Sequence, residues 1–202
     1  SLYARALLWL PVSDATSGFR AYRSEALREV DLGLIRSRGF VFQVEVLRRI
    51  LDLPGARVLE VPIIFRDRAV GSSKLSGRIV REATLEVLAL ALRRRQAPRR
   101  VYLPLDPPSY EPRVSVVIPA RVGEREPEAL RALEALQYPR ENLEVTVARG
   151  TAPSRQRNEA ARATRSEIIL FLDDDSRPSA DLLRRYVQAF WQAPTVGAVG
   201  GP

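Results

Sequence analysis

The chain has 202 residues, a hydrophobic content of 46% and a formal net charge of +8, which describes a globular protein that can bury one sizeable core or two small ones. It contains no Cys and no His, which excludes thiol nucleophiles, Cys-rich zinc sites and Ser-His-Asp catalysis, so metal binding and proton transfer must rest on carboxylates, Lys, Tyr or Arg. No apolar run approaches the roughly 18 residues that a membrane-spanning helix needs.

The positive charge belongs to the first half of the chain. Residues 1–100 hold 19 Lys and Arg against 10 Asp and Glu, a net charge of +9, whereas residues 101–202 hold 13 against 14. This excess predicts an anionic partner for the first half, such as a membrane surface, a lipid phosphate or a nucleic acid.

The first residues are predicted to form a helix, a turn and a strand. Residues 2–10 read as a helix that Pro11 ends. The sequence VSDATSGFRAY follows and predicts a turn around Asp14 and Gly18, then a short strand over residues 19–22. A carboxylate in such a turn, followed by Gly and Arg, suits a ligand site at a loop.

Two helices and a strand are predicted next. Ser24 should cap a short helix that runs to Val30. Residues 40–53 have apolar side chains at spacings of three and four, which predicts a helix with one buried stripe. The stripe consists of Phe40, Val44, Leu47 and Leu51. Residues 57–68 read as a strand in which Pro62 falls at an edge or a bulge.

The loop over residues 66–74 has two interpretations. Its sequence, RDRAVGSSK, places two serines and the only lysine of the chain behind a glycine. Backbone amides of Gly and Ser beside an ammonium group make a phosphate cradle. A solvated basic loop explains the same residues equally well.

A long helix is predicted over residues 76–96. Its apolar positions form a broad surface, and it ends on Arg93, Arg94 and Arg95, which complement the negative end of the helix dipole. Because such a helix can lie in a membrane interface, we expect peripheral membrane contact through residues 76–96. Packing against its own domain is the alternative.

A proline-rich linker over residues 96–112 precedes a segment with a different pattern. Beyond it, buried strands alternate with amphipathic helices. The predicted strands are 113–121, 143–150, 167–172 and 196–202, and the predicted helices are 127–137, 154–164 and 180–192. This alternation is typical of a doubly wound parallel sheet with right-handed crossovers.

The sequence IILFLDDDSRP, residues 168–178, predicts a ligand site. Five apolar residues read as a buried strand and lead directly into Asp173, Asp174 and Asp175. Carboxylates this close repel one another unless a cation lies between them, and at the end of a strand in an α/β sheet the usual cation is a hard divalent ion held with substrate phosphates. A solvated acidic turn that caps the next helix is the alternative.

These motifs resemble a known family. Residues 113–202 resemble the N-terminal nucleotide-binding half of an inverting family 2 glycosyltransferase, through VSVVIPAR, PSRQRNEAA, ILFLDDDSRP and VGAVGGP. Residues 1–95 resemble the C-terminal, acceptor-side half of a dolichol- or polyprenyl-phosphate mannose synthase, through LPVSDATSGFRAYRSEAL, RSRGFVFQVEVLRR, VLEVPIIFRDR and VGSSKLSGRIV. The resemblance implies an α/β fold of the GT-A type, the Rossmann-like fold of nucleotide-diphospho-sugar transferases, present as two partial modules on either side of the linker at 96–112.

Two accounts explain half-modules in this order. The chain is a fragment of a longer fused protein, or the two halves complement each other as in a circularly permuted domain, within one chain or between chains. The resemblance also implies a cytoplasmic location at the inner face of a membrane.

The resemblance implies a role for each of several residues. The metal ligands for Mg²⁺ or Mn²⁺ would be Asp173 and Asp175, and the catalytic residues Asp14 and Asp175. The residues facing the nucleotide-sugar would be Pro119, Ala120, Arg121, Arg157 and Asn158. The partners of the acceptor phosphate would be Arg20, Ser72, Ser73 and Lys74. The implied substrates are a nucleotide-sugar donor, GDP-mannose or a UDP-sugar, and a lipid-phosphate or glycan acceptor.

One departure from the family and two rival functions stay open. Family members usually place an acidic pair after the second strand, where this chain has Ala148, Arg149 and Gly150, so the donor nucleotide is undecided. A phosphatase of the haloacid dehalogenase type also places a DxD after a buried strand, but it would need Thr or Val where this chain has Arg177. A non-catalytic fragment or basic membrane-surface module is the other alternative; sparse aromatic residues argue against a nucleic-acid partner.

Overall fold

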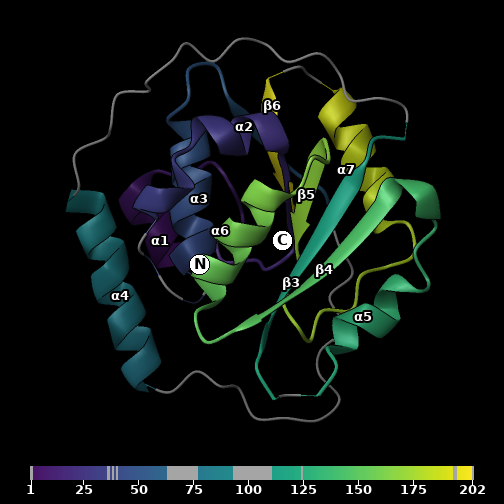
Figure 1. Cartoon of the computed structure of the whole chain (residues 1–202). Coiled ribbons are helices and arrows are strands. Elements are labelled where there is room, and N and C mark those ends of the chain that lie inside the picture. Colours follow the sequence, from purple (N-terminus) through teal and green to yellow (C-terminus); the bar gives the residue numbers. More distant parts are fainter. Residues whose placement is uncertain are drawn as a thin grey trace.

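The computed structural model describes residues 2–35, 37, 39, 41–62, 77–92, 111–123, 125–192 and 195–201. Within these residues a mixed six-stranded sheet has the strand order β2-β6-β1-β5-β3-β4. Figure 1 shows β5, β3 and β4 side by side. Its strands are β1 Arg20–Arg23, β2 Arg57–Glu60, β3 Val114–Arg121, β4 Leu143–Gly150, β5 Ile168–Phe171 and β6 Val196–Gly200. The α-helices are α1 Leu2–Leu8, α2 Ser24–Glu29, α3 Val41–Leu51, α4 Gly77–Leu92, α5 Glu128–Leu133, α6 Pro153–Ala163 and α7 Leu182–Trp191, with 3-10 helices η1 Leu32–Leu34 and η2 Arg140–Asn142.

Strands from both halves of the chain share this sheet. Strand β1 of the first half lies between β5 and β6 of the second half and is antiparallel to both, with Arg20 opposite Phe171 on one side and Gly200 on the other. Strand β2 extends the sheet by pairing parallel to β6. The strands of residues 113–202 all run parallel, as predicted, but they do not form one contiguous parallel sheet: β3, β4 and β5 are neighbours, and β1 separates β5 from β6.

Arg23 fastens strand β1 to the second half. Its Nε donates to the carbonyl of Val196 over 3.0 Å, its Nη2 donates to the carbonyl of Phe190 over 3.1 Å, and its guanidinium carbon lies 5.5 Å from the centre of the Phe190 ring. The side chain is buried, so these contacts replace the water that the cation would otherwise bind. The next residue adds a further link, because the Ser24 hydroxyl donates to the carbonyl of Ser166. Ser24 is the first residue of α2, and Arg23 is its N-cap. The prediction that Ser24 caps this helix is therefore wrong.

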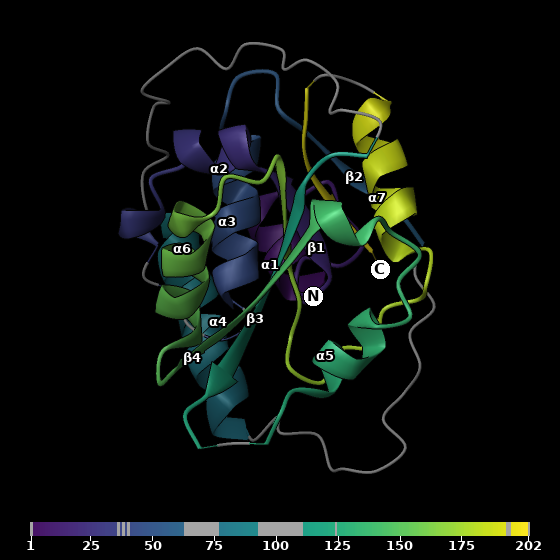
Figure 2. The same cartoon turned by 45° about the vertical axis from the view of Figure 1, so that its right-hand side comes forward.

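Helices cover both faces of the sheet (Figure 2). Helices α5 and α7 pack on one face, where apolar side chains of alternate strand positions, such as Val116 and Leu170, meet Leu133 and Tyr186. Helices α2, α3 and α6 pack on the other face, where Val117 and Phe171 lie in one apolar cluster with Phe42. Most residues of the central strands are buried, as expected for a sheet that is covered on both sides.

Helix α3 is buried on two sides, not on the one stripe that the sequence predicted. Phe42 and Ile50 face the sheet cluster, while Val44 and Leu47 lie in a third cluster with α1 and α4. Two polar residues of α3 are buried as well: Gln43 is 2% exposed and Glu45 is 0% exposed. Helices α1 and α4 therefore form an additional layer outside α3 (Figure 1).

Several predicted features lie outside the described residues. They are the end of the strand beyond Pro62, the loop with Ser72, Ser73 and Lys74, the arginines at 93–95 and most of the linker at 96–112.

Candidate functional site

The candidate site lies where parallel strands β3, β4 and β5 end. The backbone N–H of Leu172 still donates to Val117 over 3.1 Å, and the chain then turns through Asp173–Asp175, closed by a 3.0 Å bond from the N–H of Ser176 to the carbonyl of Asp173. Strands β3 and β4 end at the same edge, with Ala120 opposite Arg149. The acidic turn thus emerges at the carboxyl edge of the sheet, where α/β proteins bind ligands.

An ion pair joins Arg157 of helix α6 to the acidic turn. Its Nη2 lies 2.6 Å from Oδ1 of Asp173, and the two side chains are 6% and 48% exposed. The guanidinium carbon lies 5.3 Å from the centre of the Phe42 ring, while Nε and Nη1 are buried without a partner in the described part of the chain. Burial lowers the pKa of Arg157 and the charge of Asp173 raises it, with burial the larger effect. Each unsatisfied buried donor costs about 1–3 kcal/mol, so the two unpaired nitrogens of Arg157 lower the stability of the protein when no ligand is bound.

Gly18 brings the first half of the chain against the same carboxylate. A Cβ atom at Gly18 would lie 2.9 Å from Cγ of Asp173 and closer still to Oδ2. Real Cβ atoms essentially never approach a neighbour so closely, so a side chain at this position would displace the Asp173 carboxylate. The turn that contains Asp14 and Gly18 is therefore placed directly beside the acidic turn of the other half.

Hydrogen bonds hold the turn around Asp14 in one shape. Oδ1 of Asp14 accepts from the backbone N–H and the hydroxyl of Thr16, at 2.8 and 2.7 Å. Oε1 of Glu60 accepts from the N–H groups of Ser13 and Asp14, at 2.6 and 3.1 Å. The Asp14 carboxylate is thus partly engaged within its own turn, and strand β2 anchors the turn from behind.

Arg20, a predicted phosphate partner, lies beneath this turn. Its guanidinium donates to the carbonyls of Asp14, Ala15 and Gln43, at 2.7, 3.4 and 3.5 Å, and the residue is 1% exposed. Gly200 makes room for it, because a Cβ there would lie 3.0 Å from Nε of Arg20. In this position Arg20 ties the turn to helix α3; its role towards phosphate stays a prediction.

The predicted nucleotide-facing residues occupy two surfaces. Pro119 and Ala120 are in β3 and Arg121 ends that strand, exposed, its carbonyl 3.3 Å from Nη1 of Arg149. Asn158 instead faces η1, where its Nδ2 donates to the carbonyl of Leu32 over 2.9 Å. The structure therefore brings Arg157, but not Asn158, into contact with the acidic turn.

A cavity of about 740 Å³ lies on the Asn158 side of helix α6. It is lined from the first half by residues such as Leu32 and Ser37, and from the second half by the start of α6, including Ser154. The hydroxyl of Ser154 donates to the carbonyl of Ser37 over 2.7 Å and so bridges the two halves at its wall.

Sequence reasoning missed three buried polar residues near the site. The hydroxyl of Tyr22 donates to Oε1 of Gln43 over 3.0 Å, and burial raises the pKa of Tyr22 against the opposing effect of Arg20. Glu45 accepts from the N–H and hydroxyl of Ser37, at 3.1 and 2.6 Å, and from Arg49 at 2.9 Å. The available signal was a pair of polar residues inside the apolar run FVFQVEV.

The carboxylates of the acidic turn can hold a divalent cation only together with phosphate oxygens of a bound substrate. No group of three or more acidic side chains able to hold a metal occurs among the described residues. Mg²⁺ is commonly held by one or two carboxylates together with substrate phosphates and waters, which Asp173 and Asp175 could supply in part. Arg157 contacts Oδ1 of Asp173, so Oδ2 is the oxygen of this carboxylate that such a cation could meet.

Comparisons with known proteins agree with the resemblance inferred from the motifs. Residues 107–202 match the family described as "Glycosyltransferase like family 2". The undecaprenyl-phosphate mannosyltransferase of Micrococcus luteus is 49% identical over 87 residues, which are 43% of this chain and 35% of that protein. The polyprenol monophosphomannose synthase of Mycolicibacterium smegmatis is 42% identical over 93 residues, which are 46% of this chain and 35% of that protein. The alignments therefore span about a third of the length of these relatives, and no solved structure matches the chain.

Proposed function

We propose that this chain, whose residues 107–202 match glycosyltransferase family 2, transfers a sugar from a nucleotide-sugar to a polyprenyl phosphate or a glycan, with inversion at the sugar. The observation that carries the proposal is the approach of Gly18 to Asp173, because it unites an acceptor-side turn with the acidic turn of a nucleotide-binding half. The names of the two relatives favour mannose as the sugar and a polyprenyl phosphate as the acceptor.

In this proposal the second half binds the donor. Pro119, Ala120 and Arg121 contact the nucleotide at the end of β3, and Asp173 and Asp175 would hold Mg²⁺ or Mn²⁺ together with its diphosphate. The metal ion, when bound, offsets the charge that develops on the leaving nucleoside diphosphate. Before the donor binds, Arg157 holds the Asp173 carboxylate through their 2.6 Å contact.

The first half binds the acceptor in this proposal. Asp14 faces the sugar and the acceptor from a turn that Glu60 and Arg20 hold rigid. A phosphate acceptor is already an anion, so its attack needs no strong general base, which fits a chain without His. We also propose that Ser72, Ser73 and Lys74 bind the acceptor phosphate; they lie outside the described residues.

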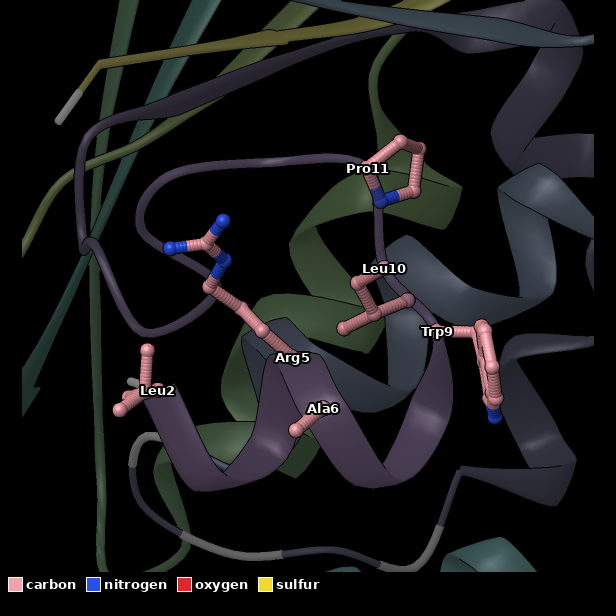
Figure 3. Close-up of a pocket in the computed structure, with 6 residues that line it drawn as sticks. All are labelled: Leu2, Arg5, Ala6, Trp9, Leu10 and Pro11. Carbon is pink, nitrogen blue, oxygen red and sulfur yellow. The ribbon is translucent and has the colours of Figure 1, made fainter.

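A lipid acceptor also explains an apolar surface over helices α1 and α4. Leu2 and Trp9 of the α1 region are 76% and 88% exposed, and Leu85 and Leu92 of α4 are 58% and 79% exposed. A hollow of about 490 Å³ lies along α1. Figure 3 shows Arg5 turned towards the following loop and Trp9 turned outward. Exposed Trp and Leu side chains suit a membrane interface, so we propose that this surface, with residues 76–96, contacts the membrane. Among the described helices none is both long and apolar enough to cross a bilayer.

Calorimetric titration tests the donor site. GDP-mannose and UDP-sugars are titrated with Mn²⁺ into the wild type, Asp175→Ala and, as a matched control, Asp181→Ala, which removes an exposed carboxylate at the start of α7. We expect the wild type and Asp181→Ala to bind a metal–nucleotide complex and Asp175→Ala to lose it. Unchanged binding in Asp175→Ala would reject the metal role.

A further inference from the structure

Arg157 makes fewer hydrogen bonds than its guanidinium allows. One of its nitrogens contacts Asp173 over 2.6 Å, the ring of Phe42 lies 5.3 Å from its guanidinium carbon, and its two other nitrogens are buried without a partner in the described part of the chain. The side chain is only 6% exposed. A buried cation with spare donors, held on a carboxylate at the sheet edge, is positioned to receive a further acceptor.

The ion pair also changes what the acidic turn can bind. Asp173 gives one oxygen to Arg157 and turns the other towards Gly18, so an arriving cation must compete with the guanidinium for this carboxylate. The positive charge of Arg157 offsets one carboxylate and opposes a bare divalent ion. A divalent cation and a nucleoside diphosphate that arrive together bring a much smaller net charge than either alone, and phosphate oxygens can accept the donors of a displaced guanidinium.

We propose that Arg157 is the resident counter-ion of Asp173 and makes metal binding conditional on the nucleotide. In the apo protein the guanidinium occupies the place of the cation; with a nucleoside diphosphate present, it turns to the phosphates and releases the carboxylate. Arg157 is thus a positioning residue that couples two ligands. The inference rests on the proposed donor site, and it adds that the metal alone binds weakly.

The test measures Mn²⁺ binding by electron paramagnetic resonance, with and without saturating GDP or UDP, in the wild type and in Arg157→Gln. We expect Arg157→Gln to bind Mn²⁺ alone about tenfold more tightly, because a nearby positive charge is gone. In the presence of the nucleotide, we expect it to bind Mn²⁺ about tenfold more weakly than the wild type does. By linkage, Mn²⁺ must then strengthen nucleotide binding less in the variant than in the wild type.

Matched variants keep the proposal falsifiable. Arg155→Gln removes an arginine two residues earlier on α6 that is 79% exposed and paired with Glu159, and it should behave as the wild type. Arg157→Lys keeps the charge but loses the planar fork, so Mn²⁺ alone should bind as in the wild type while the coupling to the nucleotide falls; it decides the question if Arg157→Gln does not fold.

Two outcomes would overturn the inference. Arg157→Gln could bind Mn²⁺ alone no better than the wild type, or both Arg157 variants could keep the wild-type coupling. A wild type that binds neither Mn²⁺ with nucleotide nor nucleotide alone would overturn the proposed donor site as well, which separates the two failures.

Discussion

Gly18 and Asp173 come from opposite halves of the chain, yet there is no room for a single methyl group between them. Gly18→Ala should therefore displace the Asp173 carboxylate while leaving the fold intact, because the obstructing atoms belong to a side chain that can rotate. We expect metal–nucleotide affinity to fall about tenfold and stability by no more than about 1–2 kcal/mol. Calorimetric titration and urea unfolding measure the two effects.

Gly33→Ala is the control for this substitution. A Cβ at Gly33 would lie 3.1 Å from Oδ1 of Asp31 and 3.2 Å from Nη2 of Arg162, away from the acidic turn. It should leave nucleotide binding unchanged. Equal binding by the two alanine variants would contradict the placement of the acceptor-side turn beside Asp173.

Replacement of Arg20 should destabilise the protein strongly. Arg20→Met removes the guanidinium that donates to the carbonyls of Asp14, Ala15 and Gln43, so we expect a loss of about 3 kcal/mol or more in the free energy of unfolding. Urea denaturation measures it, with the exposed Arg28→Met, expected within about 0.5 kcal/mol of the wild type, as control. A stable Arg20→Met that loses only phosphate binding would show that Arg20 acts on ligand and not on the fold.

Glu45 should make stability depend on acid pH. Burial raises the pKa of Glu45, but hydrogen bonds from Ser37 and Arg49 outweigh it, so the folded pKa lies below the ordinary value of 4.5. The unfolded state therefore binds the proton more readily, and the stabilisation is fully present above about pH 4.5 and is lost as the pH falls through the folded pKa. Glu45→Gln should be less stable than the wild type at pH 7, and the gap should narrow at pH 3. Urea unfolding at both pH values checks this; a gap that does not change with pH would refute it.

Trp9 should lower the free energy of unfolding and strengthen binding to membranes. It ends helix α1 with φ of 55°, a left-handed conformation usually taken by glycine, and the N–H of Leu10 closes the turn by donating to the carbonyl of Arg5 over 3.1 Å. Trp9→Gly should raise the free energy of unfolding by about 0.5–1 kcal/mol, since strain is removed and the indole is 88% exposed. It should also weaken binding to anionic lipid vesicles in a sedimentation assay.

The second tryptophan supplies the control for the vesicle assay. Trp191 is 46% exposed at the end of α7, which packs on the other face of the sheet, so Trp191→Ala should bind vesicles as the wild type does. Equal losses in both variants would argue against a specific membrane surface.

The shared sheet predicts one cooperative unfolding transition. Strand β1 pairs with β5 and β6, so neither half can lose its structure alone without exposing unpaired strand edges. Native-state hydrogen exchange should give the amides of β1, β5 and β6 a common opening free energy. Two groups of amides, one from each half, with separate opening free energies would contradict this.

Local pattern predicted the elements better than their assembly. The positions of β3, β4, β5 and α6 followed from apolar periodicity, and the carboxylates after β5 followed from a buried strand that runs into three aspartates. The place of β1 could not be predicted, because a four-residue strand carries no local signal for partners about 150 residues away. The contacts of Asp173 with Gly18 and Arg157 could not be predicted for the same reason, because they join residues that are separated in the sequence and meet only in the fold. The burial of Gln43 and Glu45 could have been found, because polar residues within a buried apolar run need partners.

The position of β1 also constrains how the chain folds on the ribosome. Its partners β5 and β6 are synthesised about 150 and about 180 residues later, so the centre of the sheet cannot form until both strands have left the exit tunnel. Until then β1 and the helices that follow it expose apolar faces to the cell. Pairings at this sequence separation close slowly, and such intermediates tend to aggregate. Expression of this protein should therefore benefit from slow synthesis and from chaperones that hold the first half until the last strand arrives.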